Sequence, residues 1–299
     1  PSPAARRRKG MSHGLGLKCG PRAPSNAEAR AAQPAGEVRL FPMPKFSGVD
    51  GNLMLEALHR AQQSHPVCAV WDPALQLPSR LIEYVCAICA DVAPQIRQEA
   101  VLLLKRYRWR FKAGGSDGSP TSPWQVVALT CANLSMKHWQ HQGIPEQRLH
   151  FLSCNAYTRQ DFIDAEVEVM RLLDCNVHWE GSLLAEWIPL LLHLAGPLTL
   201  EAEDVGKIAG VAMHIADVLI FQDELMAAHP PSSLAAATVH AAVMVCTRRF
   251  RGYPLTLRVG HFCRCEEQIV KLSEQVLFAS IGARSAEVLL EGSGITAEE

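Results

Sequence analysis

No apolar run in this sequence is long enough to cross a membrane. A spanning helix needs about 18 consecutive apolar residues. The two longest candidates are residues 182–195, interrupted by Glu186 and His193, and residues 232–246, interrupted by His240. Both runs are therefore predicted to be buried helices of a protein without a membrane partner.

An excess of charge of one sign is also missing. The 299 residues carry 29 Lys and Arg against 30 Asp and Glu, for a formal net charge of −1. No general positive field attracts a phosphate backbone or an anionic membrane. The densest basic clusters in the predicted folded region are short, at Arg248-Arg249-Arg251 and at residues 106–108. Direct contact with nucleic acid is therefore not expected, although a nucleic-acid-binding helical protein stays open as an alternative.

Enzyme signatures are missing as well. The sequence contains no HExxH motif, and no GxSxG, GxxxxGK[ST] or GxGxxG motif follows a predicted strand. These motifs hold catalytic metals, activate nucleophiles or cradle phosphates, so their absence favours a non-catalytic protein. We expect neither a cofactor nor a small-molecule ligand.

Metal-binding patterns are weak. Cys86-Ala-Ile-Cys89 has the CxxC spacing but no second pair accompanies it, and Cys263-Arg-Cys265 is spaced too closely. His138, His214 and His240 are interpreted as ordinary helix histidines, so no metal site is predicted. Six cysteines in apolar helical runs are predicted to be small core residues of a reduced, intracellular protein: Cys86, Cys89, Cys131, Cys154, Cys175 and Cys246.

Strand-like alternation of useful length is absent, whereas helical spacing of apolar residues extends from residue 52 almost to residue 282. The predicted helices are 52–64, 78–91, 95–108, 124–139, 146–153 and 157–177, then 182–194, 203–221, 232–248 and 266–281. A break at 178–181 divides them into two groups of about five helices. The prediction is an all-α fold of two tandem five-helix bundles.

The proposed boundaries follow from composition. Residues 1–45 are rich in Pro, Gly, Ala and Arg and are predicted to be a disordered tail. A leading helix and the first bundle occupy 46–177, the second bundle occupies 178–282, and a flexible tail follows at 283–299.

Two helix starts have capping signals, and one segment is predicted to lack a helix. Ser122 precedes Pro123 and Gln125 in a capping-box pattern, and Thr158 precedes Asp161 by three residues. We therefore expect Ser122 and Thr158 to be N-caps. Residues 252–257 are predicted to be a short connector.

Lys137 and Glu166 carry the main functional signal. Lys137 ends a run, 124–139, that is apolar almost all round, and Glu166 lies in the middle of the helix 157–177. A charge in such a helix needs an opposite partner if it is buried. If the two helices pack together, the ammonium and carboxylate project from one rim, where they can bind another polypeptide. The alternative is that both are ordinary solvated charges.

These residues lie in patterns that resemble the cyclin box. The cyclin fifth-helix pattern is matched by Tyr157-Thr158, Glu166 and residues 170–173 (Met-Arg-Leu-Leu), and its third-helix ending by residues 134–139 (Leu-Ser-Met-Lys-His-Trp). The second-helix pattern is matched by Ala100-Val101 and Arg106-Tyr107. The resemblance implies that the two bundles are cyclin boxes and that Lys137 and Glu166 contact a partner such as a cyclin-dependent kinase. Trp139 and Tyr84 are the other predicted partner-binding residues; packing in the core is the alternative for Trp139.

A narrower resemblance covers roughly residues 50–282. Residues 56–63 (Glu-Ala-Leu-His-Arg-Ala-Gln-Gln), 81–85 (Leu-Ile-Glu-Tyr-Val) and 99–101 (Glu-Ala-Val) look like the cyclin N-terminal domain-containing family that acts in meiotic crossover maturation. It implies a nuclear, non-catalytic protein that binds meiotic recombination proteins at recombination sites. A regulatory subunit that activates a cyclin-dependent kinase is the alternative, and a nucleic-acid-binding cyclin-fold factor is the third hypothesis.

Overall fold

Helices account for the regular structure of this chain. The computed structural model describes residues 50–64, 67–114, 120–195, 202–246, 253–265 and 267–283, and within these ranges every regular element is helical. The all-α prediction is confirmed for this part of the chain. The tail predicted at 1–45 and nearly all of the tail predicted at 283–299 lie outside the described residues.

The first group of helices begins with the leading helix, α2 (Gly51–Ser64). It continues with α3 (Val67–Val70), the short η1 (Pro73–Leu75), α4 (Ser79–Ile88), α5 (Pro94–Ala113), α6 (Trp124–Gln140), α7 (Glu146–Leu152) and α8 (Arg159–Leu172). The second group comprises α9 (Leu184–Ala195), α10 (Ala202–Leu219), α11 (Asp223–Ala228), α12 (Pro231–Cys246), α13 (Tyr253–Cys263) and α14 (Ile269–Ala283).

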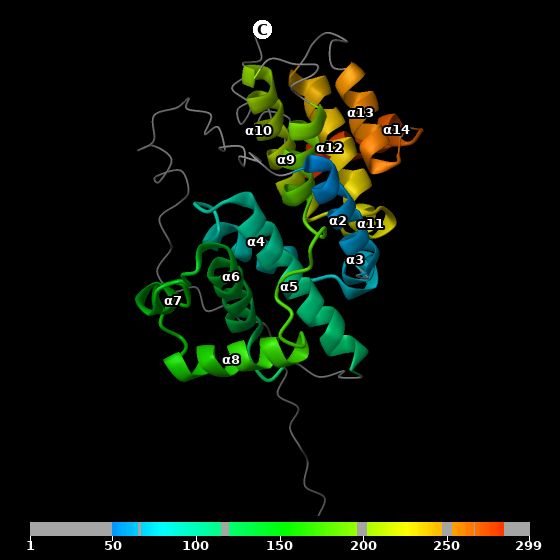
Figure 1. The fold of residues 1–299 in the computed structure, drawn as a ribbon. Coiled ribbons are helices and arrows are strands. Elements are labelled where there is room, and N and C mark those ends of the chain that lie inside the picture. Colours follow the sequence, from blue (N-terminus) through cyan, green and yellow to red (C-terminus); the bar gives the residue numbers. More distant parts are fainter. Residues whose placement is uncertain are drawn as a thin grey trace, which may run out of the picture. The chain divides into compact units, whose positions relative to one another are not determined.

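α6 is the central helix of the first group (Figure 1). Every residue from Val126 to Met136 is buried, as expected for a helix that is apolar on all faces. α6 packs against α4, α5 and α8, so it is enclosed by neighbours along most of its length. Its last turn carries Lys137 and His138, where the apolar run ends and the chain leaves the core.

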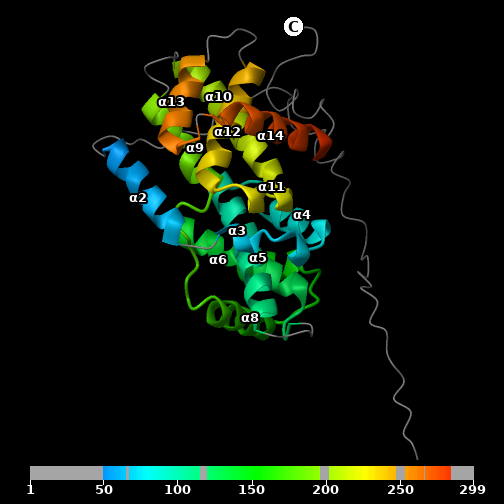
Figure 2. The same ribbon diagram turned by 90° about the vertical axis from the view of Figure 1, so that its right-hand side faces the viewer.

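α12 has the same central position in the second group (Figure 2). It packs against α9, α10, α13 and α14. Its buried stretch is rich in alanine, including Ala235, Ala236 and Ala237. Small side chains allow neighbouring helices to approach closely, which explains how one helix can contact four others.

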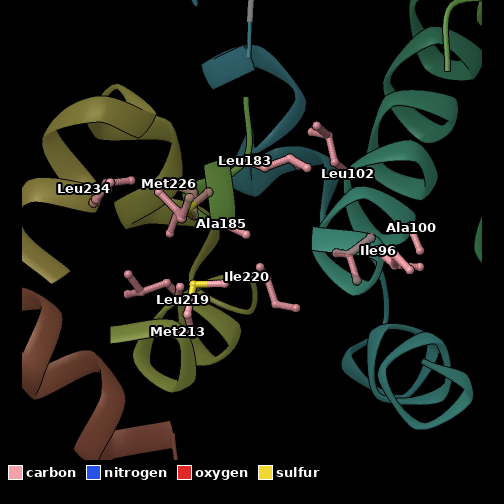
Figure 3. Packing of buried hydrophobic residues seen from close by; sticks show 14 of the residues in the cluster. Ile96, Ala100, Leu102, Leu183, Ala185, Met213, Leu219, Ile220, Met226 and Leu234 are labelled. Carbon is pink, nitrogen blue, oxygen red and sulfur yellow. The ribbon is translucent and has the colours of Figure 1, made fainter. Parts of the chain in front are cut away.

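The hydrophobic core is continuous between the two groups. Figure 3 shows Leu102 of α5 near Leu183, which lies before α9, with Met226 of α11 farther along the same apolar layer. These residues belong to one buried cluster, and the described residues all lie within one compact unit, 38–299. The two helical groups therefore share a core.

Two of the three local predictions are corrected by the structure. Thr158 caps α8 as predicted: its hydroxyl accepts the N–H of Asp161, whose carboxylate accepts the N–H of Thr158. Ser122 is not a helix cap, because its N–H donates to Glu168 and α6 begins after Pro123 without a side-chain cap. The connector predicted at 252–257 is wrong from Tyr253 on, since α13 begins there; residue 252 lies outside the described residues.

The cysteine prediction is partly wrong. Cys89 and Cys131 are buried as expected, but Cys154 and Cys175 are exposed. Both exposed cysteines follow a helix and have left-handed backbone conformations, with φ of 55° and 57°. They lie where the helix has already ended and therefore outside its apolar stripe.

Among the described residues, no helix combines the length and the hydropathy that a membrane crossing requires.

Candidate functional site

The predicted rim forms where the last turn of α6 meets the middle of α8. The two helices pack against each other. The apolar stripe of α8, formed by Phe162, Ala165 and Val169, is buried, so Glu166 is turned toward the edge of this contact. Lys137 reaches the same edge because it is the first exposed residue after the buried stretch of α6.

Lys137 and Glu166 form an ion pair at this rim, as their helical positions predicted. The Lys137 ammonium donates to both carboxylate oxygens of Glu166, at 2.6 Å to Oε1 and 2.7 Å to Oε2. The side chains keep 44% and 33% of their exposure. An exposed pair of this kind contributes only about 0–1 kcal/mol to folding. The pair therefore contributes little to folding stability, and both charged groups are accessible to a binding partner.

The loop after α6 covers the stem of Lys137. A Cβ on Gly143 would lie 3.1 Å from both Cγ and Cε of Lys137 and 2.4 Å from Oδ1 of Asn133. That Oδ1 accepts the N–H of Ile144 at 2.7 Å, which fixes the loop against α6. Only glycine fits at position 143 without displacing these groups, so the loop restricts how Lys137 can project.

Exposed apolar side chains flank Glu166 on α8. Ile163 and Val167 are 43% and 50% exposed. Being four residues apart, they lie on one face of the helix, and Ile163, three residues before Glu166, is the one beside it on the helix surface. The rim thus combines an ion pair with an apolar strip, a composition that suits a protein–protein contact.

Tyr84 lies away from this rim. Its hydroxyl donates to the backbone oxygen of Leu152 at 2.8 Å and accepts from Gln125 at 3.4 Å. Gln125 is in the first turn of α6 and Lys137 in its last, which separates them by roughly 18 Å along a helix that rises about 1.5 Å per residue. Tyr84 and Lys137 therefore cannot belong to one small contact patch.

Trp139 is directed toward the segment that joins the two helical groups. Its ring is half-buried and packs edge-to-face against the ring of His178, with centroids 5.5 Å apart. Its indole Nε1 is buried without a hydrogen-bond partner. This geometry agrees with the alternative that Trp139 packs within the protein, and a direct contact between Trp139 and a partner remains a prediction.

A second polar site, which the sequence did not predict, surrounds His178. The imidazole lies between two carboxylates: Nδ1 is 2.6 Å from Oε1 of Glu99 on α5, and Nε2 is 3.0 Å from Oε1 of Glu186 on α9. Burial lowers the pKa of His178, but the hydrogen bonds to Glu186 and Glu99 outweigh this and raise it to about 9. His178 is therefore positively charged at neutral pH, and it joins α5 to α9.

Arg106 holds the adjacent part of the same segment. Its guanidinium donates to the backbone oxygens of Asn176 at 2.6 Å and Val177 at 2.9 Å, and it stacks over the ring of Trp179 at 3.9 Å. The residue is 2% exposed. Burial lowers its pKa to about 10, which leaves it charged at neutral pH. We call these contacts, together with those of His178, the linker clamp.

Two further charged residues of α5 extend these contacts into the second helical group. Lys105 pairs with Asp223 of α11, and Arg97 pairs with Asp217 of α10. Gln98 accepts the N–H of Ala185 at the start of α9 at 3.0 Å. α5 is thus one of the helices that anchor the second group, together with α2, which packs against α9, and α3, which packs against α11.

One sequence signal could have revealed these residues. Gln98, Glu99, Lys105 and Arg106 interrupt the apolar positions of α5 just as Lys137 interrupts α6, and all four are buried. The same requirement for a partner applied to them. Because Arg106 is buried, it cannot contribute to a basic surface that contacts nucleic acid. The other basic cluster, Arg248-Arg249-Arg251, lies outside the described residues.

Comparisons with known proteins identify the fold. No protein-family model matches the chain, and no curated protein sequence matches it. The X-ray structure of a viral cyclin from herpesvirus saimiri is similar, with a TM-score of 0.54 and 14% sequence identity, over 84% of this chain and 96% of the viral cyclin. At this identity the likeness concerns the fold. This chain therefore has the two-bundle, all-α fold of a cyclin.

Proposed function

We propose that this chain is a non-catalytic, cyclin-type regulatory protein that acts by binding another protein at the rim of Lys137 and Glu166. The observation that carries the proposal is the Lys137–Glu166 ion pair, which is exposed and has the exposed Ile163 beside Glu166 on the same helix. Folding gains little from such a pair. Truncating a charged anchor that a partner covers typically costs about 2 kcal/mol or more of binding free energy, so a change at this pair would affect binding much more than folding.

The cellular context we propose is the nucleus of meiotic cells, where the protein promotes crossover maturation through recombination proteins. This context comes from the sequence resemblance at residues 56–63, 81–85 and 99–101. The cyclin fold is compatible with it, because a cyclin box offers helical surfaces for partner proteins. The two bundle boundaries, 46–177 and 178–282, belong to the same proposal.

Charge reversal at Lys137 tests the rim. Lys137→Glu places two carboxylates together and removes the donor, while Lys207→Glu reverses a similar surface pair, Lys207–Glu203 on α10. Each variant is used to capture partners from meiotic tissue, with identification by mass spectrometry. We expect the affinity of Lys137→Glu for its partners to fall by about 30-fold or more, which corresponds to at least about 2 kcal/mol of binding free energy. Lys207→Glu should retain its partners.

Circular dichroism and thermal melts establish that both variants fold. The double variant Lys137→Glu with Glu166→Lys restores the attraction within the chain but inverts what the partner meets, so it should still fail to bind. Retention of every partner by Lys137→Glu would show that the rim is not the binding site. Capture of proteins unrelated to recombination would reject the meiotic context while leaving the rim intact.

A cyclin that activates a cyclin-dependent kinase is the second candidate. The fold shared with a viral cyclin favours it. The two candidates differ in outcome: purified chain mixed with candidate kinases would raise phosphorylation of a peptide substrate only in the second case. Activation that Lys137→Glu abolishes and Lys207→Glu preserves would establish this function.

A further inference from the structure

We infer that Glu99, His138 and His178 form a binding site for a divalent transition-metal ion, with Zn²⁺ as the ion that their chemistry fits best. Each side chain can offer one ligand atom, and these atoms all lie within 4.8 Å of one another. The three residues come from α5, from the last turn of α6 and from the segment before α9. Two imidazoles and a carboxylate are a ligand set that zinc accepts, with a fourth position left for water.

An unsatisfied carboxylate oxygen supports this assignment. Glu99 is 1% exposed, and its Oε1 is engaged by His178. Its second oxygen, Oε2, is buried without a hydrogen-bond partner. A buried anionic oxygen without a partner costs free energy, typically about 1–3 kcal/mol or more. A cation bound to both oxygens of Glu99 would remove that cost.

Glu186 is placed to orient His178 for metal binding. Metal-ligating histidines commonly donate their second ring N–H to a carboxylate, which fixes the tautomer and raises the basicity of the ligand nitrogen. Nε2 of His178 has this contact with Glu186, whose other oxygen accepts the N–H of Leu183 at 3.2 Å. Nδ1, which points at Glu99, is then the ligand atom. On metal binding its proton is released to solvent.

The required movements are small. Zinc–ligand bonds of about 2.0–2.2 Å place tetrahedral ligands roughly 3.4 Å apart. Nδ1 of His178 and Oε1 of Glu99, now 2.6 Å apart, must separate slightly. His138 must approach from the exposed end of α6, where its ring stacks on His178 with centroids 5.0 Å apart. A turn of this exposed ring brings one of its nitrogens toward the other two ligands.

The ligand chemistry selects the ion. Ca²⁺ and Mg²⁺ prefer oxygen ligands, and this site offers two nitrogens, so neither ion should compete. The bound ion would join α5, the end of α6 and the segment before α9. His138 directly follows Lys137, so the ion would also hold the turn that presents the rim.

Zinc titration of the untagged, full-length, reduced protein tests the site. Calorimetry with ZnCl₂ measures affinity and stoichiometry, and Co²⁺ absorption reports the ligand type. His138→Asn removes a ligand at an exposed position, and His141→Asn is the matched control, three residues away and also exposed. His141 has φ of 58°, a left-handed conformation that asparagine tolerates. Glu99→Gln provides a second ligand variant.

We expect one zinc ion per chain, an affinity at least about tenfold weaker in His138→Asn, and no change in His141→Asn. At one zinc concentration the melting temperature of the wild type should rise by more than that of His138→Asn, and Mg²⁺ should raise the melting temperature of neither protein. Equal affinity in the wild type and His138→Asn would overturn the proposal. So would thiolate-to-cobalt charge-transfer bands, which would assign the ion to cysteines.

Discussion

Replacement of Arg106 is the sharpest test of the linker clamp. Its guanidinium makes two hydrogen bonds to backbone oxygens and one stacking contact with Trp179. A hydrogen bond from a charged donor contributes about 1.5–3 kcal/mol, and a desolvated cation–π contact adds about 2 kcal/mol. The gross sum is roughly 5–8 kcal/mol. The net value is smaller, because burying the guanidinium costs solvation, the same effect that lowers its pKa.

We expect Arg106→Met to lower the free energy of unfolding by about 3 kcal/mol, the lower end for breaking a buried charged contact. Arg106→Lys keeps the charge but loses the planar fork, and should cost about half as much. Arg110→Met is the matched control on the same helix, since the contacts of Arg110, a pair with Asp174 and a position over the ring of Trp109, are made by an exposed side chain; it should cost less than about 1 kcal/mol. Guanidinium denaturation measures all three. A loss below about 1 kcal/mol for Arg106→Met would refute the reasoning.

Two further predictions concern stability and reactivity. Gly181→Ala should lower the free energy of unfolding by about 1–3 kcal/mol, because φ is 71° and the new Cβ would lie 2.7 Å from the Leu58 oxygen. Gly210→Ala, in open space on α10, should leave the free energy of unfolding unchanged or raise it slightly. Guanidinium denaturation measures both. Burial raises the pKa of Cys89 to about 12, so its thiol stays protonated at pH 8 and should resist iodoacetamide, whereas exposed Cys154 should react. Mass spectrometry of the native protein would contradict this if Cys89 were labelled as fast as Cys154.

The helices and the rim could be predicted because their signals are local. The spacing of apolar residues identified α6 and α8, and Lys137 and Glu166 were conspicuous as charges in those helices. The ion pair then required only that α6 and α8 pack together, as consecutive long helices of a bundle commonly do. The partner role of Lys137, Glu166, Trp139 and Tyr84 is a separate matter and remains a prediction.

The linker clamp could not be predicted with the same ease, because its partners are distant in sequence. Arg106 and Val177 are 71 residues apart, and His178 meets Glu99 across 79 residues. Polarity alone shows that such residues need partners, but not which ones. Ser122 failed as a cap for a related reason: Glu168, from another helix, accepts the N–H that Gln125 would accept in a capping box.

The linker clamp also limits which fragments of this protein can be expressed in a folded form. A fragment that stops at residue 175 would strip Arg106 and Glu99 of Asn176, Val177 and His178, exposing two charges in a surface shaped to hold a peptide chain. Such a truncation would also expose the core that the two groups share and would be prone to aggregation, so lost binding would say nothing about where a partner docks. Deletion mapping should instead keep both halves together and rely on point substitutions.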